Sequence, residues 1–247
     1  MVDDRSRSWA RGPKEIAKIC HRRFGIGADG LILLQEHPSL DYRMVYYNAD
    51  GQPASMCGNG GRCLARFAYD LGMGDGNYRF EAVDGIHEAV VGGHGVRLSM
   101  RPTSFPRTYG DHWILDTGSP HLLRFLESQD SLEQLNLLEE AQKLRYNADF
   151  REEGINVNFI SQDAQNPSTL HMRTYERGVE DETWSCGTGV TAAALVAHHL
   201  HHYSAPVTIH TDGGTLKVSF TPHYDEQEFR AIILEGPAHK VFEGSWP

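Results

Sequence analysis

The segment WSCGTGVTAAALVAHHL, residues 184–200, carries the strongest structural signal in this chain. Its central run, residues 192–197, is apolar on almost every side, which is typical of a helix buried inside a domain. Gly187 and Gly189 allow a ligand to approach the backbone closely where that helix begins. Helix N-termini offer unpaired N–H donors and partial positive charge, which hold a carboxylate and lower the pKa of a thiol below its free value of about 8.5. Cys186 is therefore predicted to be a reactive thiol that faces an anion.

A second segment, MCGNGGR at residues 56–62, has the same design. It opens a helix whose apolar side chains recur at helical spacing until Gly72. One such cysteine is a weak indication, because buried cysteines are common and usually inert. A second one, Cys57, makes the indication much stronger.

The two segments are in register with each other along the chain. Their cysteines lie 186 − 57 = 129 positions apart, and at the same offset Tyr46 coincides with Tyr175. Asn48 and Arg177 each stand nine positions before the cysteine that follows them. The spacing predicts a duplicated half, longer than a solenoid repeat, in which each half presents one thiol.

Length and composition fit two globular halves. The chain has 247 residues, 40% apolar and 10% aromatic content, and a formal charge of −10. An acidic chain is a poor nonspecific ligand of nucleic acid, which requires a basic face. We find no long apolar span and no signal peptide, so we expect no membrane association. Four cysteines in a chain of this size do not form a disulfide framework, which favours a reducing cytoplasm.

The expected elements alternate between short strands and helices. A helix is expected from Pro13 to Gly25, with Cys20 in its buried face. A second is expected behind a cap at Ser131, with apolar residues from Leu132 to Ala141. Strands are expected at 31–34, 41–47, 78–83, 87–91, 96–100, 113–115, 122–126 and 169–175. The proline-bracketed link at 101–106 divides residues 1–104, to which 237–247 return, from residues 105–236.

Three motifs suggest ligands that we reject. The G-x-G-x-x-G at residues 25–30 follows a helix and opens a strand, the reverse of a dinucleotide site. The histidines at 198–202 lack a carboxylate or cysteine that would complete a metal set. Cys57 and Cys63 miss the usual zinc spacing, and no lysine has a pyridoxal context. We therefore expect no metal and no cofactor.

Two thiols at similar helix N-termini fit one kind of chemistry. Inversion of a carbon that bears hydrogen requires one group to remove the proton and another to return a proton on the opposite face, and a thiolate with a thiol does both. The α-proton of an amino acid is very weakly acidic. Such a site must exclude water and stabilise the developing carbanion with backbone donors.

The combined motifs resemble those of diaminopimelate epimerases, over about residues 16–238. The resemblance rests on Asn48-Ala49-Asp50-Gly51 before the first cysteine segment and Tyr175-Glu176-Arg177-Gly178 before the second. It implies a cofactor-independent isomerase of LL- and meso-diaminopimelate, in lysine and peptidoglycan precursor biosynthesis, and a cytoplasmic homodimer. It also implies a mixed α/β fold with two pseudo-symmetric domains, each a curled sheet or barrel around a central helix, and a cleft between them.

The resemblance assigns roles to individual residues. Cys57 and Cys186 match the acid and base pair, whereas His121 and Glu176 match neighbours that tune the thiols. The positions that match substrate-binding residues are Asn48, Gly58, Asn59, Asn156, Glu176, Arg177, Gly187 and Thr188. Arg177 suits the distal carboxylate.

Some positions depart from the family pattern. Ser119 replaces an asparagine, and Gly30 replaces a glutamine seen in some members. The first strand of the family, with its Gly-Asn-Asp-Phe segment, has no counterpart before Met1. We therefore expect Met1 to be internal in the natural protein, with roughly a dozen residues upstream.

Three other functions remain possible from the sequence. A related racemase or isomerase, of the proline racemase or phenazine type, would share the fold but not both motif turns. A cysteine hydrolase would pair Cys186 with His121 and leave the second thiol unexplained. A noncatalytic binding protein is the third alternative.

Overall fold

Each predicted thiol stands directly before a long helix, and each helix belongs to its own folding unit. Helix α2 (Gly58–Asp70) follows Cys57, and α5 (Gly187–His201) follows Cys186. The computed structural model describes residues 1–93, 95–166 and 168–246. Its two units comprise residues 1–98 with 237–247, here called unit 1, and residues 99–236, here called unit 2. The domain limit expected between residues 104 and 105 stays a prediction.

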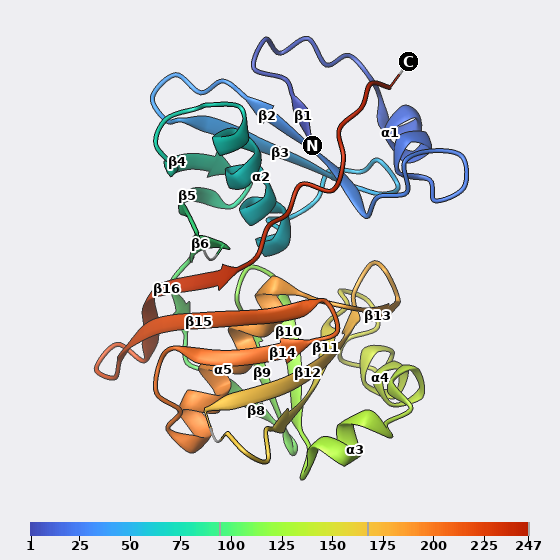
Figure 1. Cartoon of the computed structure of the whole chain (residues 1–247). Helices are drawn as coiled ribbons and strands as arrows, with labels where there is room; N and C mark the ends of the chain where they lie inside the picture. The colour runs from blue at the N-terminus through green and yellow to red at the C-terminus, as the bar shows by residue number, and fades with distance from the viewer. Residues whose placement is uncertain (94, 167, 247) are drawn as a thin grey trace. The chain divides into compact units, whose positions relative to one another are not determined.

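The strands of unit 1 form a sheet in chain order (Figure 1). They are β1 (Val2–Asp3), β2 (Gly30–Gln35), β3 (Tyr42–Asn48), β4 (Asn77–Ala82), β5 (Gly85–Gly92) and β6 (Gly95–Met100), along which the chain passes into unit 2. The β1–β2 and β3–β4 pairs are parallel, and the other neighbouring pairs are antiparallel.

Alternate residues of β2 face two different helices. Leu31 and Leu33 pack in a buried cluster with Ile16 and Ile19 of α1 (Pro13–Cys20). Ile32 points the other way, because a Cβ added at Gly60 of α2 would lie 2.8 Å from its terminal methyl. This period of two is that of a strand buried on both faces. The sheet of unit 1 is thus a layer between α1 and α2, and the predicted core position of Cys20 is confirmed.

Unit 2 repeats this arrangement and extends it. Its strands, in sheet order, are β16 (Glu228–Gly236), β15 (Gly214–His223), β14 (Val207–Thr211), β12 (Thr169–Glu176), β11 (Asn156–Gln162), β10 (Pro120–Phe125), β9 (His112–Asp116) and β8 (Arg107–Tyr109), with β13 (Asp181–Thr183) on β12 and β7 (Thr103–Ser104) on β16. From β10 to β16 the pairs run parallel, antiparallel, parallel, antiparallel and antiparallel, as they do from β1 to β6. The duplication predicted from the sequence is therefore present in the topology.

Helix α5 is the centre of unit 2. Every residue from Gly187 to Ala197 is buried. The helix contacts β9, β10, β11, β14, β15 and β16, so the sheet curls around it. This is the predicted mixed α/β architecture of a curled sheet about a central helix.

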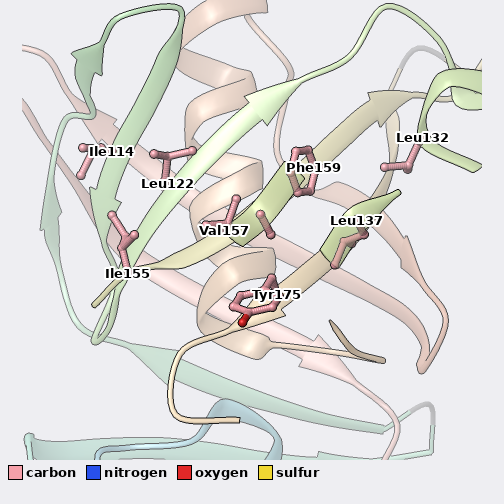
Figure 2. Packing of buried hydrophobic residues seen from close by; sticks show 9 residues of the cluster. Ile114, Leu122, Leu132, Leu137, Ile155, Val157, Phe159 and Tyr175 are labelled. Carbon is pink, nitrogen blue, oxygen red and sulfur yellow. The ribbon is translucent and has the colours of Figure 1, made fainter. Parts of the chain in front are cut away.

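The outer face of the unit 2 sheet is covered by α3 (Gln129–Glu133) and α4 (Leu137–Arg145). Figure 2 shows Leu132 and Leu137 of these helices close to Val157, Phe159 and Tyr175 of the strands. The single helix predicted behind a Ser131 cap is wrong. Ser128 is the cap, accepting the Ser131 N–H at 3.2 Å, and a break before Leu137 separates the two helices.

Two further expectations are corrected. The first helix ends at Cys20 rather than Gly25, because the chain turns back over its last carbonyls, where the Ile26 N–H donates to Ile19 O at 2.7 Å. Gly25 lies so close that a Cβ would sit 2.1 Å from Lys18 O.

The coincidence of Tyr46 with Tyr175 in the sequence is not a structural equivalence. Tyr175 packs against α4, whereas Tyr46 is cross-strand from Ile32, on the face that α2 covers.

Candidate active site

In unit 1, Cys57 is the N-cap of α2. Its backbone is extended, with φ −113° and ψ 116°. The Gly60 N–H donates to Cys57 Sγ at 3.3 Å, and the Gly61 N–H donates to the Cys57 carbonyl at 2.8 Å. The sulfur therefore takes the place of a capping oxygen, where helix N–H groups and the dipole favour negative charge.

Arg62 supports the same helix turn from inside. Its buried guanidinium donates to Gly58 O at 3.3 Å and to Asn59 Oδ1 at 2.9 Å. Burial lowers the pKa of Arg62, an effect that the nearby Cys63 and Cys57 thiols oppose. The guanidinium fixes the residues that follow Cys57, a role that the sequence motif alone does not reveal.

Asn48 ends β3 and begins the predicted turn. Its N–H donates to Gln52 O at 2.9 Å, and its carbonyl accepts the Gly51 N–H at 2.9 Å. Gly51 has φ +83°, and a Cβ there would lie 2.1 Å from Pro13 O. Only glycine satisfies both conditions, so this turn is fixed against the start of α1.

In unit 2, Cys186 is the N-cap of α5 and is 8% exposed. Its Sγ lies 3.4 Å from Thr188 Oγ1, in the first helical turn. The Thr188 carbonyl accepts the Thr117 hydroxyl at 2.8 Å, which ties the turn to the end of β9. Both thiols therefore stand at the N-terminus of the central helix of their unit, as the sequence predicted.

His121 on β10 lies behind Thr188. Its Nε2 is 2.9 Å from Thr188 Oγ1, and its Nδ1 is 3.1 Å from Asn158 Nδ2 on β11. The ring is fully buried, and this burial lowers the pKa of His121 to about 3. The imidazole is therefore neutral at physiological pH. Its connection to the thiol runs through the threonine hydroxyl.

The turn after β12 presents Arg177. Its guanidinium donates to Glu153 O at 3.1 Å and to Ser119 Oγ at 3.4 Å. Both acceptors are neutral, and within residues 1–93, 95–166 and 168–246 no carboxylate pairs with this guanidinium. A guanidinium held in place without an anionic partner is well suited to bind a carboxylate.

Asn156 holds this turn. Its Oδ1 accepts the Arg177 N–H at 2.9 Å, and its Nδ2 donates to Ser119 Oγ at 2.8 Å and to Pro120 O at 2.9 Å. Both amide hydrogens are thus used within the chain. Ser119, the position that departs from the family asparagine, lies between Asn156 and Arg177 and accepts from both.

Glu176 precedes Arg177 at the end of β12. Its Oε2 accepts the Thr183 hydroxyl at 2.7 Å, and its carbonyl accepts the Glu180 N–H at 2.8 Å. The carboxylate is therefore oriented by β13. Its expected influence on a thiol stays a prediction.

Each unit thus gathers its own share of the predicted residues. Unit 1 holds Asn48, Cys57, Gly58 and Asn59, and unit 2 holds His121, Asn156, Glu176, Arg177, Cys186, Gly187 and Thr188. Across the part of the chain that the structure describes, no three histidine, cysteine or acidic side chains are placed to hold a metal ion. His198, from the rejected histidine cluster, bonds to the Tyr203 carbonyl and the Tyr224 hydroxyl.

Comparison with known sequences assigns the chain to a family. The family model described as diaminopimelate epimerase matches residues 1–102 and 113–241. The chain belongs to the diaminopimelate epimerase family. A diaminopimelate epimerase of Flavobacterium psychrophilum is 42% identical over 98% of this chain and 93% of its own length. One of Chlorobaculum tepidum is 43% identical over 99% of this chain and 95% of its own length.

Solved structures of proteins with other names share the fold. A phenazine biosynthesis protein from Bacillus anthracis has a TM-score of 0.69 at 14% identity, over 95% of this chain and 88% of that chain. A hydroxyproline epimerase from Agrobacterium vitis has a TM-score of 0.60 at 16% identity, over 90% of this chain and 77% of that chain. Family membership makes the chain an isomerase, an amino-acid epimerase, and decides against the hydrolase.

The structure adds residues to those expected from the family motifs. Asn158, Thr174 and Glu180 join the hydrogen-bond networks around Cys186 and Arg177. Asn158 gives only a weak signal in the sequence, because β11 also contains the polar residues Asn156, Ser161 and Gln162. Glu180 gives no comparable signal, because an acidic residue in a turn is ordinary.

Among the described residues, no helix combines the length and apolar character that a membrane span needs.

Proposed function

We propose that this chain interconverts LL- and meso-diaminopimelate by a two-thiol acid/base mechanism. The observation that carries the proposal is the repeated cysteine N-cap, Cys57 on α2 and Cys186 on α5. One cysteine, as thiolate, removes the α-proton, and the other, as thiol, returns a proton to the opposite face of the carbon. For the reverse reaction the two exchange roles.

The substrate groups are assigned to donors of matching charge. Backbone N–H groups in the first turns of α2 and α5 bind the carboxylate at the reacting carbon and stabilise the carbanion that forms there. Arg177 binds the distal carboxylate. This assignment is supported because the Arg177 guanidinium has no anionic partner among the described residues. The step precedes lysine and supplies a peptidoglycan precursor. Cytoplasmic location and a homodimer stay predictions.

A nucleophilic cysteine would require a different arrangement around Cys186. In a cysteine hydrolase the imidazole contacts the sulfur and accepts its proton. Here His121 Nε2 bonds to Thr188 Oγ1, and burial lowers the pKa of the ring to about 3. These contacts support a thiol that acts in proton transfer.

The experiment follows the α-hydrogen in deuterated water with LL-diaminopimelate as substrate. With two thiols, the product takes deuterium from the returning thiol, while recovered substrate keeps its hydrogen early in the reaction. We expect Cys57→Ser and Cys186→Ser each to reduce epimerisation by at least about a hundredfold, because each removes one proton-transfer group. Cys63→Ala, on the helix that Cys57 caps, is the matched control and should remain active. Near-normal turnover by either folded serine variant would refute the mechanism.

A further inference from the structure

A buried polar network lies beneath the first turn of α5, although the corresponding place in unit 1 is apolar. A Cβ added at Gly189 would lie 2.6 Å from Asn158 Oδ1, whereas one added at Gly60 would lie 2.8 Å from Ile32 Cδ1. Gly60 and Gly189 are the second glycines of the two Cys-Gly-x-Gly segments. Ile32 shows that an aliphatic side chain is sufficient to pack against the second glycine. The presence of a fully buried polar residue, Asn158, at the corresponding position is therefore explained by its hydrogen bonds.

The contacts of Asn158 define which end of its amide is which. Its Nδ2 donates to the Leu122 carbonyl at 3.2 Å, and its Oδ1 accepts the Thr174 hydroxyl at 3.0 Å. Because a carbonyl oxygen only accepts, a flipped amide would set two oxygens against each other. The second hydrogen of Nδ2 therefore points to His121 Nδ1, at 3.1 Å.

This orientation fixes the tautomer of His121. A neutral imidazole has one acceptor nitrogen and one N–H donor, and Nδ1 is the acceptor here. The hydrogen is then on Nε2, which donates to Thr188 Oγ1 at 2.9 Å. Since that oxygen accepts from the ring, its own hydrogen is directed to Cys186 Sγ, at 3.4 Å.

We infer that Asn158 is a positioning residue that holds His121 as the Nε2–H tautomer, so that the Thr188 hydroxyl donates to the Cys186 sulfur and favours its thiolate form. This rests on the proposed role of Cys186 in proton transfer. Asn158 and His121 act through Thr188, which of these three residues is the one whose side chain contacts the Cys186 sulfur.

The electrostatic surroundings agree with a neutral ring. Desolvation is the main cause of the lowered pKa of His121. The charge of Asp116 on β9 acts to raise this pKa, and the charge of Arg177 in the turn after β12 acts to lower it further. Glu176 at the end of β12 and Glu180 in that turn are the acidic residues beside Arg177, and the first turn of α5 contains no acidic side chain. A donor hydroxyl beside a sulfur stabilises the charged form of that sulfur.

The first test measures the tautomer itself on the chain without substitutions. Long-range ¹H–¹⁵N correlation spectra of ¹⁵N-labelled protein distinguish protonated from unprotonated ring nitrogens. We expect His121 to show a protonated Nε2 and an unprotonated Nδ1 at neutral pH. A protonated Nδ1, or a doubly protonated ring, would overturn the inference.

The second test is the rate at which iodoacetamide alkylates Cys186, resolved from Cys57 by peptide mass spectrometry across a range of pH. The rate follows the thiolate fraction. Asn158→Leu should slow Cys186 at neutral pH by about tenfold, the effect of one hydrogen bond to a charged group, and raise the pH of half-maximal rate. Thr188→Val should act in the same way, whereas Thr188→Ser should restore the reaction. Cys57 in the same samples should react at an unchanged rate.

A matched control removes a different buried polar group from the same strand. Ser161 on β11 is fully buried, and its hydroxyl has no hydrogen-bond partner among the described residues. Ser161→Ala should leave the Cys186 pH profile unchanged. If folded Asn158→Leu and Thr188→Val react as the wild type does, the inference fails. Neither test uses a substrate, so a chain inactive towards diaminopimelate would refute the proposed function without altering these readouts.

Discussion

Arg145 and Glu180 form an ion pair that joins α4 to the turn carrying Arg177. Arg145 Nη2 donates to Glu180 Oε1 at 2.8 Å, and the same oxygen accepts the Gly178 N–H at 3.2 Å. Tyr146 donates to Glu180 Oε2 at 2.8 Å. Partial burial acts to raise the pKa of Glu180, but the Gly178 N–H, Tyr146 and Arg145 outweigh it, and the pKa is lowered. The carboxylate thus closes the turn onto the helix.

Breaking this pair should misplace Arg177. We expect Glu180→Ala to raise KM for diaminopimelate by about tenfold or more, with a smaller loss of kcat. The free energy of unfolding should fall by about 1–3 kcal/mol, since a partly buried arginine loses its partner. Steady-state kinetics and denaturant unfolding measure the two effects. Lys143→Met removes the ion pairs of this exposed lysine with Glu139 and Glu140 on the same helix and should change neither quantity. Equal effects of the two substitutions would contradict the role of the pair.

Substitution of Arg177 itself tests the binding of the distal carboxylate. Arg177→Lys keeps the charge but loses the planar, two-pronged geometry, so we expect KM to rise by about tenfold, with Arg177→Gln more severe. Thermal unfolding should change little, because among the described residues the guanidinium bonds only to a carbonyl and a hydroxyl. Arg230→Lys, at an exposed ion pair of unit 2, is the control. An unchanged KM in both Arg177 variants would place the carboxylate elsewhere.

The two helix glycines should respond differently to alanine. At Gly189 the new methyl would meet Asn158, which three hydrogen bonds hold, so we expect a loss of about 1–3 kcal/mol in unfolding free energy. At Gly60 it meets the terminal methyl of Ile32, which can rotate away, and alanine favours the helix by up to about 1 kcal/mol. Gly60→Ala should therefore be close to neutral. Denaturant titration measures the free energy of unfolding of both variants. A Gly189→Ala protein more stable than the wild type would contradict the prediction, because it would show that Asn158 can move without loss of stability.

Acid should destabilise the fold through His121. The pKa of this ring falls from its ordinary 6.5 to about 3 in the folded chain. Between these values only the unfolded chain binds the proton, so stability rises with pH and is lost as the pH falls below about 6.5, by at most roughly 1.4 kcal/mol per unit. Unfolding measured from pH 7 to pH 4.5 should show this slope, with a smaller slope in His121→Gln. Burial also lowers the pKa of His112 and His199, which leaves a residual slope.

Ser161→Ala provides the comparison for that measurement. It removes a buried group that carries no titratable proton, so its slope should equal that of the wild type. A His121→Gln protein with the full wild-type slope would show that the ring is not the titrating group.

The amino-acid sequence alone determined where the thiols stand and that the chain is duplicated. Cysteine and glycine in front of an apolar run specify a helix N-terminus by local geometry, and a fixed offset between two such segments is visible without coordinates. The hydrogen bonds of the turn at Asn48–Gly51 are also local, although its packing against Pro13 of α1 is a tertiary contact. These features depend on contacts between residues close together in the chain.

Only the tertiary structure decided what supports each thiol. His121 and Thr188 are 67 positions apart, and Asn158 and His121 are 37 apart, so no local pattern links them. Which face of a strand a residue occupies also depends on register, and this separates Tyr46 from Tyr175 although the sequence aligns them. The break between α3 and α4 follows from packing against the sheet. Hydrogen bonds and packing between distant segments form only when the chain is folded, and they determine which of the predicted residues are connected.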